Sequence, residues 1–336
     1  MVFTQEILSY LHIADKTGAW GTLGTIKPNK SFDPEVDVEK LNKALQDKGN
    51  QTIIDIVTGI NNDQRQEVVK LYKELFQQDL TENLKKNLSG NLEKVIVGLL
   101  KTPAAYDAHE LKATMKGLGT DEATLTEILC TRTSQQLQEI QACYKKEFQK
   151  DLEKDITSDT NQPYRDLLLA LTLGKREKDS GIIDYGLIYQ DSKILSTLGP
   201  KNTPNIVQWI TIFTERSSGH LRRVFGHYDN TNTVTVEESI RKNFKGDFQK
   251  AMLSLVSIMK NAPLYFAEKL HSAMKGLGTN EDTLTRILVS RSEIDLLSIR
   301  VEYRKKYGKS LYSSILSEVK GDYRTALLLL CRAEDV

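Results

Sequence analysis

The chain carries the octet MKGLGTDE at Met115–Glu122 and carries it again, as MKGLGTNE, at Met274–Glu281. After one further residue, both copies continue with Thr-Leu-Thr, one variable residue and Ile-Leu. Seven identities in eight positions, followed by a second shared stretch, do not arise by chance. The chain of 336 residues therefore contains an internal repeat, and its architecture follows from that repeat outward.

An apolar stripe extends the repeat to the rest of the chain. Its residues stand four apart, the spacing of one helical face, in stripes that begin at Tyr72, Tyr144 and Tyr303, and a looser copy surrounds Phe225. This frame predicts four units of about 70 residues. We assign an N-terminal tail to 1–32, a linker to 177–187, and the four repeats to 33–104, 105–176, 188–263 and 264–336.

The periodicity within each unit is helical. In the second unit Leu125 and Leu129 share one face, and Ser134 begins a longer helix that runs to Phe148. We expect Thr120 to be the N-cap of the helix after the glycine-rich turn, because acids follow it in the first turn. About five helices fit in each unit, so the fold class predicted is all-α.

Charge and cysteine content exclude several classes of protein. Lys and Arg number 46 against 45 Asp and Glu, so the net charge of +1 provides no basic field for nucleic acid. Three cysteines without a CxxC motif indicate neither a disulfide framework nor a zinc site. The N-terminus does not read as a signal peptide, and no apolar run is long enough to span a bilayer. We expect a cytoplasmic protein that meets membranes only peripherally, with export without a leader left open.

The glycine-rich turns have the composition of a cation site. Gly117 and Gly119, like their counterparts in the second octet, permit backbone angles that aim several carbonyl oxygens at one point. Calcium takes such oxygens together with carboxylates. Asp159 follows Gly117 by 42 residues, and Glu318 follows Gly276 by the same number. Equal offsets in two repeats predict one site with two distant halves.

The other two units serve as an internal control. The position of the acid is occupied by Asn87 in the first unit and by Asn243 in the third. Their turns differ as well: the first is shortened to Asp-Lys-Gly-Asn-Gln, and the third contains two prolines. Turn and acid are therefore present together or absent together. Ordinary helix–helix turns with a glycine at the C-cap, and acids that merely face solvent, are the competing interpretation.

The sequence resembles the annexin family after about residue 33, through its four helical repeats, the two octets and the downstream acids in SDT and SEVKGD. The resemblance implies a curved disc whose convex face binds calcium. It implies that the carbonyl groups of Met115, Gly117 and Gly119 with Asp159, and of Met274, Gly276 and Gly278 with Glu318, are the ligands. It also implies weaker accessory sites at Thr120 with Glu122 and at Thr279 with Glu281, and none in the first and third units.

Charge counting gives the expected mechanism. One carboxylate leaves calcium with about one uncompensated positive charge and open coordination positions, which an anionic lipid headgroup can fill. Lys116 and Lys275 are then expected to contact headgroups, and Leu118 and Leu277 to enter the interface. We expect calcium-dependent binding to anionic phospholipid by a membrane-organising protein that is not an enzyme. A metal-dependent hydrolase is disfavoured, because the sequence offers no catalytic base or nucleophile near the turns.

The N-terminal tail is a separate signal. Ile7, Leu8 and Leu11 share one helical face, which suits binding in a partner's groove. The tail resembles that of annexins whose N-terminal helix docks on a small dimeric EF-hand protein, although Thr4 stands where those tails carry an apolar anchor. Docking of the tail on the chain's own core is the alternative. A second functional hypothesis is therefore a protein–protein adaptor that acts through the tail, with weak or vestigial calcium and lipid binding.

Overall fold

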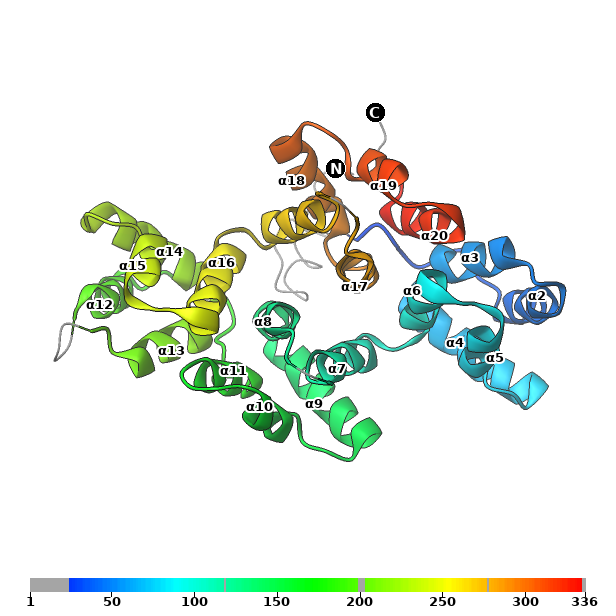
Figure 1. The fold of residues 1–336 in the computed structure, drawn as a ribbon, viewed down its shortest axis with the longest axis horizontal. Helices are drawn as coiled ribbons and strands as arrows, with labels where there is room; N and C mark the ends of the chain where they lie inside the picture. The colour runs from blue at the N-terminus through cyan, green and yellow to red at the C-terminus, as the bar shows by residue number, and fades with distance from the viewer. Residues whose placement is uncertain (1–23, 118, 199–202, 277, 334–336) are drawn as a thin grey trace. The chain divides into compact units, whose positions relative to one another are not determined.

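The computed structural model describes residues 24–117, 119–198, 203–276 and 278–333. These residues form nineteen helices, α2 to α20, and no strand, apart from an isolated bridge between Leu198 and Pro204 (Figure 1). The expectation of an all-α fold is confirmed.

Five helices make up each repeat. Repeat 1 contains α2 (Pro34–Asp47), α3 (Asn50–Gly59), α4 (Asn62–Phe76), α5 (Leu80–Asn87) and α6 (Gly90–Leu100). Repeat 2 contains α7 (Pro103–Thr114), α8 (Glu122–Thr131), α9 (Ser134–Phe148), α10 (Leu152–Asp159) and α11 (Tyr164–Thr172). Repeat 3 contains α12 (Tyr185–Ser196), α13 (Ile206–Glu215), α14 (Ser218–Thr231), α15 (Val236–Asn243) and the first part of α16 (Gly246–Ala273). Repeat 4 contains the rest of α16, α17 (Glu281–Arg291), α18 (Leu296–Tyr307), α19 (Leu311–Glu318) and α20 (Gly321–Cys331).

A break inside α16 separates repeats 3 and 4. Asn261 leaves helical geometry with φ −159° and ψ 92°, and Pro263 follows it. The Asn261 side chain accepts a hydrogen bond from the backbone N–H of Leu264 at 3.0 Å. Asn261 therefore ends one helix and caps the next, as an N-cap asparagine does.

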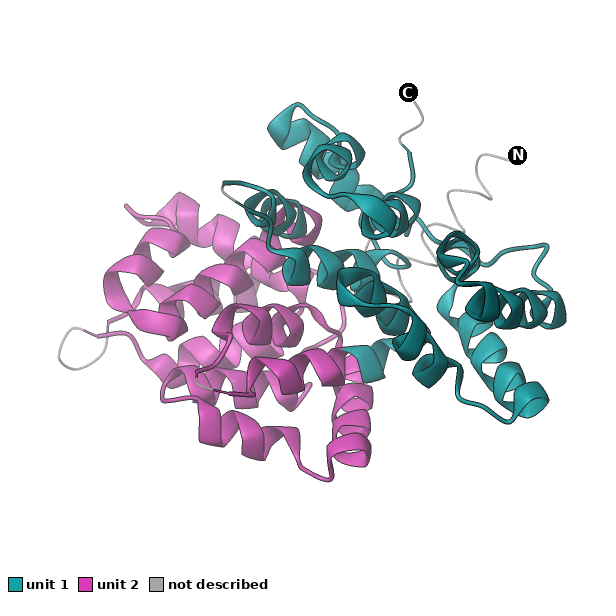
Figure 2. Ribbon diagram, turned by 45° about the vertical axis from the view of Figure 1, so that its right-hand side comes forward, with its two compact units in different colours: residues 1–106, 266–336 teal, residues 107–265 magenta. Residues whose placement is uncertain are grey.

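The chain divides into two compact units (Figure 2). The first consists of Met1–Tyr106 with Phe266–Val336, and so holds repeats 1 and 4; the second, Asp107–Tyr265, holds repeats 2 and 3. In the first unit α20 packs against α3 and α6, and α17 packs against α6. In the second unit α12 packs against α14, and α11 packs against α8 and α13. Each candidate site can therefore be described within a single unit.

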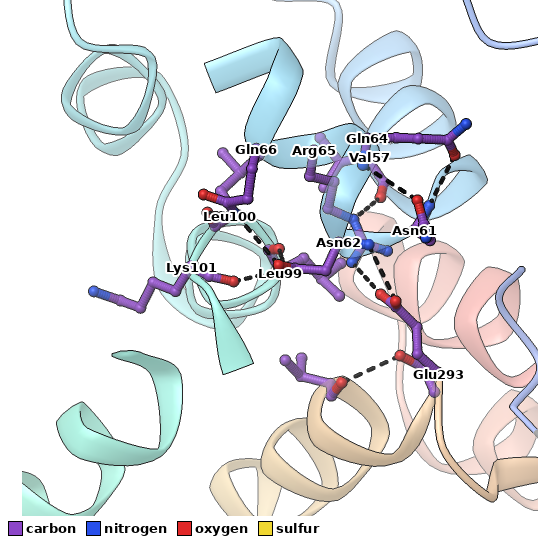
Figure 3. Close-up of polar contacts among 12 residues, drawn as sticks. Val57, Asn61, Asn62, Gln64, Arg65, Gln66, Leu99, Leu100, Lys101 and Glu293 are labelled. Atoms are coloured by element: carbon purple, nitrogen blue, oxygen red, sulfur yellow. Dashed lines mark hydrogen bonds and ion pairs between the residues drawn. The ribbon is translucent and has the colours of Figure 1, made fainter. Parts of the chain in front are cut away.

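A buried arginine joins repeats 1 and 4 inside the first unit (Figure 3). The Arg65 side chain is 1% exposed; its Nε donates to the carbonyl of Val57 at 2.7 Å, and its Nη1 donates to Oε1 of Glu293 at 2.8 Å. The other oxygen of Glu293 accepts from the backbone N–H of Asn62 at 3.1 Å. Glu293 thus pairs with a buried charge and also binds the first turn of α4.

The first described residues of the chain are bound to the same unit. The backbone N–H of Ile26 donates to the carbonyl of Ser292 at 2.9 Å, and the Ile26 side chain is buried. The Thr25 hydroxyl donates to the carbonyl of Leu330 at 2.6 Å. We assigned residues 24–26 to the tail on sequence grounds, and the structure shows Thr25 and Ile26 bonded to the first unit.

Candidate metal sites in repeats 2 and 4

The turn of repeat 2 is an open loop of backbone between α7 and α8. Gly117 and Gly119 have φ values of 108° and 101°, a region that favours glycine, and a Cβ at either position would meet nothing within 4 Å. The backbone N–H of Asp121 donates to the carbonyl of Thr114 at 2.9 Å and closes the neck of the loop. Gly117 and Gly119 are thus exposed, and a backbone hydrogen bond closes the base of the loop.

The turn of repeat 4 has the same construction. Gly276 and Gly278 have φ values of 114° and 95°, again with open space around them. The backbone N–H of Asn280 donates to the carbonyl of Ala273 at 2.8 Å, the counterpart of the neck in repeat 2. Met115 is 9% exposed and Met274 is half-buried, so both methionines anchor their loops while the glycines are exposed.

The predicted acids occupy equivalent places. Asp159 is the last residue of α10 and Glu318 is the last residue of α19, each at the end of an eight-residue helix. Both acids are half-buried. The carboxyl end of a helix carries partial negative charge from its unpaired carbonyl groups. An acid at that position adds to this charge, and the combination favours a nearby cation.

Hydrogen bonds bring loop and acid together in both repeats. The Thr120 hydroxyl donates to the backbone carbonyl of Asp159 at 3.2 Å. The Thr279 hydroxyl donates to Oε1 of Glu318 at 2.6 Å. In both repeats the turn therefore lies next to the helix end that carries the acid. The acceptor of the threonine hydroxyl is the backbone carbonyl of Asp159 in repeat 2 and the side-chain carboxylate of Glu318 in repeat 4.

Repeats 1 and 3 lack this arrangement among the described residues. Between α2 and α3 the turn consists of Lys48 and Gly49 alone, too short for a carbonyl-lined loop. The amide of Asn87 donates to the carbonyl of Asn83 at 2.8 Å, and the amide of Asn243 donates to the carbonyl of Ser239 at 2.9 Å. At the acid position, both repeats therefore carry an amide that bonds back to its own helix.

One capping prediction is wrong. The N-cap of α8 is Asp121, whose side chain accepts from the backbone N–H of Thr124 at 3.0 Å, and not Thr120. The Thr120 hydroxyl is engaged by Asp159 instead, so it does not cap the helix. Glu122 is the first residue of α8, and Glu281 is the first residue of α17. The accessory positions thus follow directly after the loops, and both glutamates are half-buried.

Two buried hydroxyl pairs lie behind the loops and were not predicted from the sequence. Tyr164 bonds to Thr126 at 2.8 Å and donates to the carbonyl of Glu122 at 3.0 Å. Tyr323 bonds to Thr285 at 2.9 Å and donates to the carbonyl of Glu281 at 3.2 Å. The signal was available, because threonine and tyrosine stand 38 residues apart in both repeats.

The remaining predicted positions divide into two groups. Lys116 and Lys275 are exposed beside their loops, as contact with headgroups requires. Several predicted contacts lie outside the described residues: Leu118, Leu277, Ile7, Leu8 and Leu11.

The donor set fits a hard cation. Each site offers neutral backbone oxygens and a carboxylate, the ligands that calcium prefers. Within the described residues there is no group of three or more His, Cys, Asp or Glu side chains that could hold a metal. In the same part of the chain, no helix combines the length and apolarity needed to cross a bilayer.

Four five-helix repeats of one design define an all-α repeat protein. A sequence model of the annexin family matches one stretch in each repeat: 36–99, 106–171, 201–255 and 265–330. Annexin A9 of Mus musculus is 49% identical over 335 residues, which cover 99% of this chain and 96% of that protein. The chain belongs to the annexin family.

Solved structures agree with this assignment. The structure of annexin III has a TM-score of 0.91 at 40% identity and covers 94% of this chain and 98% of its own. Calcium-bound annexin (Sm)1 has a TM-score of 0.85 at 29% identity and covers 97% of each chain. Annexins as a family bind calcium and phospholipid membranes, and they are generally not enzymes.

Proposed function

We propose that this chain binds calcium at two split sites, in repeats 2 and 4, and attaches through the bound ion to anionic phospholipid. The observation that carries the proposal is the hydrogen bonding of each loop to its distant acid, Thr120 to Asp159 and Thr279 to Glu318. When bound, calcium would supply a positive charge with open coordination positions for lipid phosphate or carboxylate oxygens.

Each residue of the site has a distinct role in this proposal. The carbonyl groups of Met115, Gly117 and Gly119, and of Met274, Gly276 and Gly278, provide neutral oxygens. Asp159 and Glu318 each provide one full negative charge to the ion held by the loop, which suits weak binding in solution and tighter binding once lipid contributes. Glu122 and Glu281 follow the loops and suit weaker accessory sites. Lys116 and Lys275 are exposed and suit direct contact with anionic headgroups.

The test is co-sedimentation with phosphatidylserine vesicles across a calcium titration. We expect the native chain to pellet with calcium and to remain in solution with EGTA. The double variant Asp159→Asn/Glu318→Gln should lose pelleting, while the charge-matched control Glu153→Gln/Glu302→Gln in the same repeats should keep it. Pelleting of the double variant at the native calcium concentration would contradict the two-site proposal.

The second candidate function is an adaptor that acts through the N-terminal tail, favoured by the apolar face of Ile7, Leu8 and Leu11. Its partner would be a small dimeric EF-hand protein. The variant Ile7→Ser/Leu8→Ser/Leu11→Ser in the full chain separates the two functions. It should leave calcium-dependent pelleting intact under the first proposal. If the native chain does not pellet even at millimolar calcium, the adaptor function is the better account. Both proposals place the protein in the cytoplasm, at the membrane surface when calcium rises.

A further inference from the structure

The two hydroxyl pairs behind the loops distinguish repeats 2 and 4 from repeats 1 and 3. The fifth residue of the second helix is Thr126 in repeat 2 and Thr285 in repeat 4, and tyrosine stands five residues after the acid in both. At the same two positions repeat 1 has Ile54 and Leu92, and repeat 3 has Ile210 and Phe248, all of them buried. Hydroxyl pairs therefore occur with the loop and the acid, and apolar pairs occur without them.

Hydrogen-bond chemistry fixes the direction of each pair. A carbonyl only accepts, so the single O–H of Tyr164 donates to Glu122, and Thr126 must be the donor to the tyrosine oxygen. The same holds for Thr285, Tyr323 and Glu281. Tyr164 is 5% exposed and Tyr323 is 8% exposed, so water does not readily substitute for these bonds.

The phenols stay neutral donors at physiological pH. Burial raises the pKa of Tyr323 to about 12, although the hydrogen bond from Thr285 acts to lower that pKa. Burial likewise raises the pKa of Tyr164. Ionisation of either tyrosine would remove the proton that it donates to the first carbonyl of α8 or α17.

The position of the pairs relates them to the sites. Tyr164 follows Asp159 by five residues, and the carbonyl that it binds belongs to Glu122, the first residue after the loop. The short segment Thr120–Glu122 is therefore bonded at both ends to the segment Asp159–Tyr164. Thr120 bonds Asp159 at one end, and Tyr164 bonds Glu122 at the other. Repeat 4 has the same two links, from Thr279 to Glu318 and from Tyr323 to Glu281.

We propose that the Thr126–Tyr164 and Thr285–Tyr323 pairs are positioning residues that hold each loop in register with its distant acid, so that a divalent cation meets both halves without prior rearrangement. The inference rests on the proposed function. A site assembled in advance binds more tightly because less ordering remains to be done on binding. The buried apolar residues at the equivalent positions of repeats 1 and 3 cannot form hydrogen bonds that orient the segment.

The test is the full-length double variant Tyr164→Phe/Tyr323→Phe, which removes two hydroxyl groups and leaves the rings. The matched control is Tyr72→Phe in repeat 1, where a buried tyrosine also loses hydrogen bonds, to Asn42 and Asn83. Two quantities are measured: the calcium midpoint for pelleting with phosphatidylserine vesicles, and the melting temperature in EGTA.

We expect the double variant to raise the calcium midpoint about five-fold, which is about 1 kcal/mol, the net value of one hydrogen bond, at 1.4 kcal/mol per factor of ten. The Tyr72→Phe control should lower the melting temperature and leave the calcium midpoint unchanged. Thr126→Val/Thr285→Val should raise the midpoint about two-fold, because the tyrosine bond to the carbonyl survives. The threonine variant also decides the question if the tyrosine variant fails to fold.

A calcium-dependent native chain whose midpoint moves no further in the tyrosine variant than in Tyr72→Phe would overturn the inference and leave the proposed function standing. A native chain that does not respond to calcium would overturn both. Calorimetric titration with calcium alone, without vesicles, separates a weaker ion site from a weaker lipid contact. The inference requires the calorimetric affinity to fall as well.

Discussion

Removing the carboxylate of Glu293 should destabilise the first unit by about 3 kcal/mol. The Glu293→Ala variant leaves the guanidinium of Arg65 buried at 1% exposure with the Val57 carbonyl as its hydrogen-bonded partner, and it removes the acceptor for the backbone N–H of Asn62. Breaking a buried ion pair on one side costs about 3–5 kcal/mol. Glu293 is 29% exposed, so water can replace part of the lost contact, and the lower end of that range applies.

Glu293→Gln refines the magnitude. One amide oxygen can accept from either Arg65 or Asn62 but not from both as two carboxylate oxygens do, so about half of the loss is expected, about 1–2 kcal/mol. The assay is urea unfolding in EGTA followed by circular dichroism. Glu67→Ala, an exposed acid on the same helix α4, is the control and should stay within about 0.5 kcal/mol. If Glu293→Ala cost no more than this control, the buried pair would not be a stabilising contact.

Three further outcomes follow from single residues. Gly276→Ala should cost about 2 kcal/mol in urea unfolding because its φ is 114°, whereas Gly226→Ala, in a helix with open space, should stabilise by about 0.5–1 kcal/mol. Burial alone would raise the pKa of Asp155. Hydrogen bonds from Lys112 and a tyrosine have the larger combined effect and lower that pKa. The stability it adds is complete above its unfolded pKa of about 3.9 and is lost as pH falls through the lower folded value, so the deficit of Asp155→Asn at pH 7 should shrink near pH 2. Burial raises the pKa of Cys130 to about 12, so iodoacetamide should label Cys130 at pH 8 only after unfolding, as mass spectrometry of digests would show.

Local patterns made the helices predictable from the sequence. The start of α9 at Ser134 and its end at Phe148 were both predicted, because a periodic apolar stripe is a local signal. The assignment of the cap of α8 failed for a tertiary reason. Thr120 and Asp121 can both cap a helix, and the choice depends on Asp159, which is far away in sequence and engages the Thr120 hydroxyl.

The offset of the acids was visible in the sequence because it repeats, but the contacts between the two halves were not. Thr279 bonds the carboxylate of Glu318, whereas Thr120 bonds the backbone of Asp159, a difference set by side-chain length that periodicity does not record. The hydroxyl pairs went unnoticed because a buried tyrosine in an apolar helix suggests core packing until its partner is known. Only the fold shows that Tyr164 reaches Glu122.

The helix ends explain why the acids and the loops occur together. A carboxylate at the last residue of a helix opposes the helix dipole by about 0.3–1 kcal/mol, and Asp159 and Glu318 both stand there. In repeats 1 and 3 the same position holds Asn87 and Asn243, which avoid that repulsion and donate to a carbonyl of their own helix. An acid is therefore destabilising at this position unless a positive charge compensates it. A cation held by the glycine-rich turns of repeats 2 and 4 would provide that charge, and this is the strongest physical reason for the calcium sites that we propose in these two repeats.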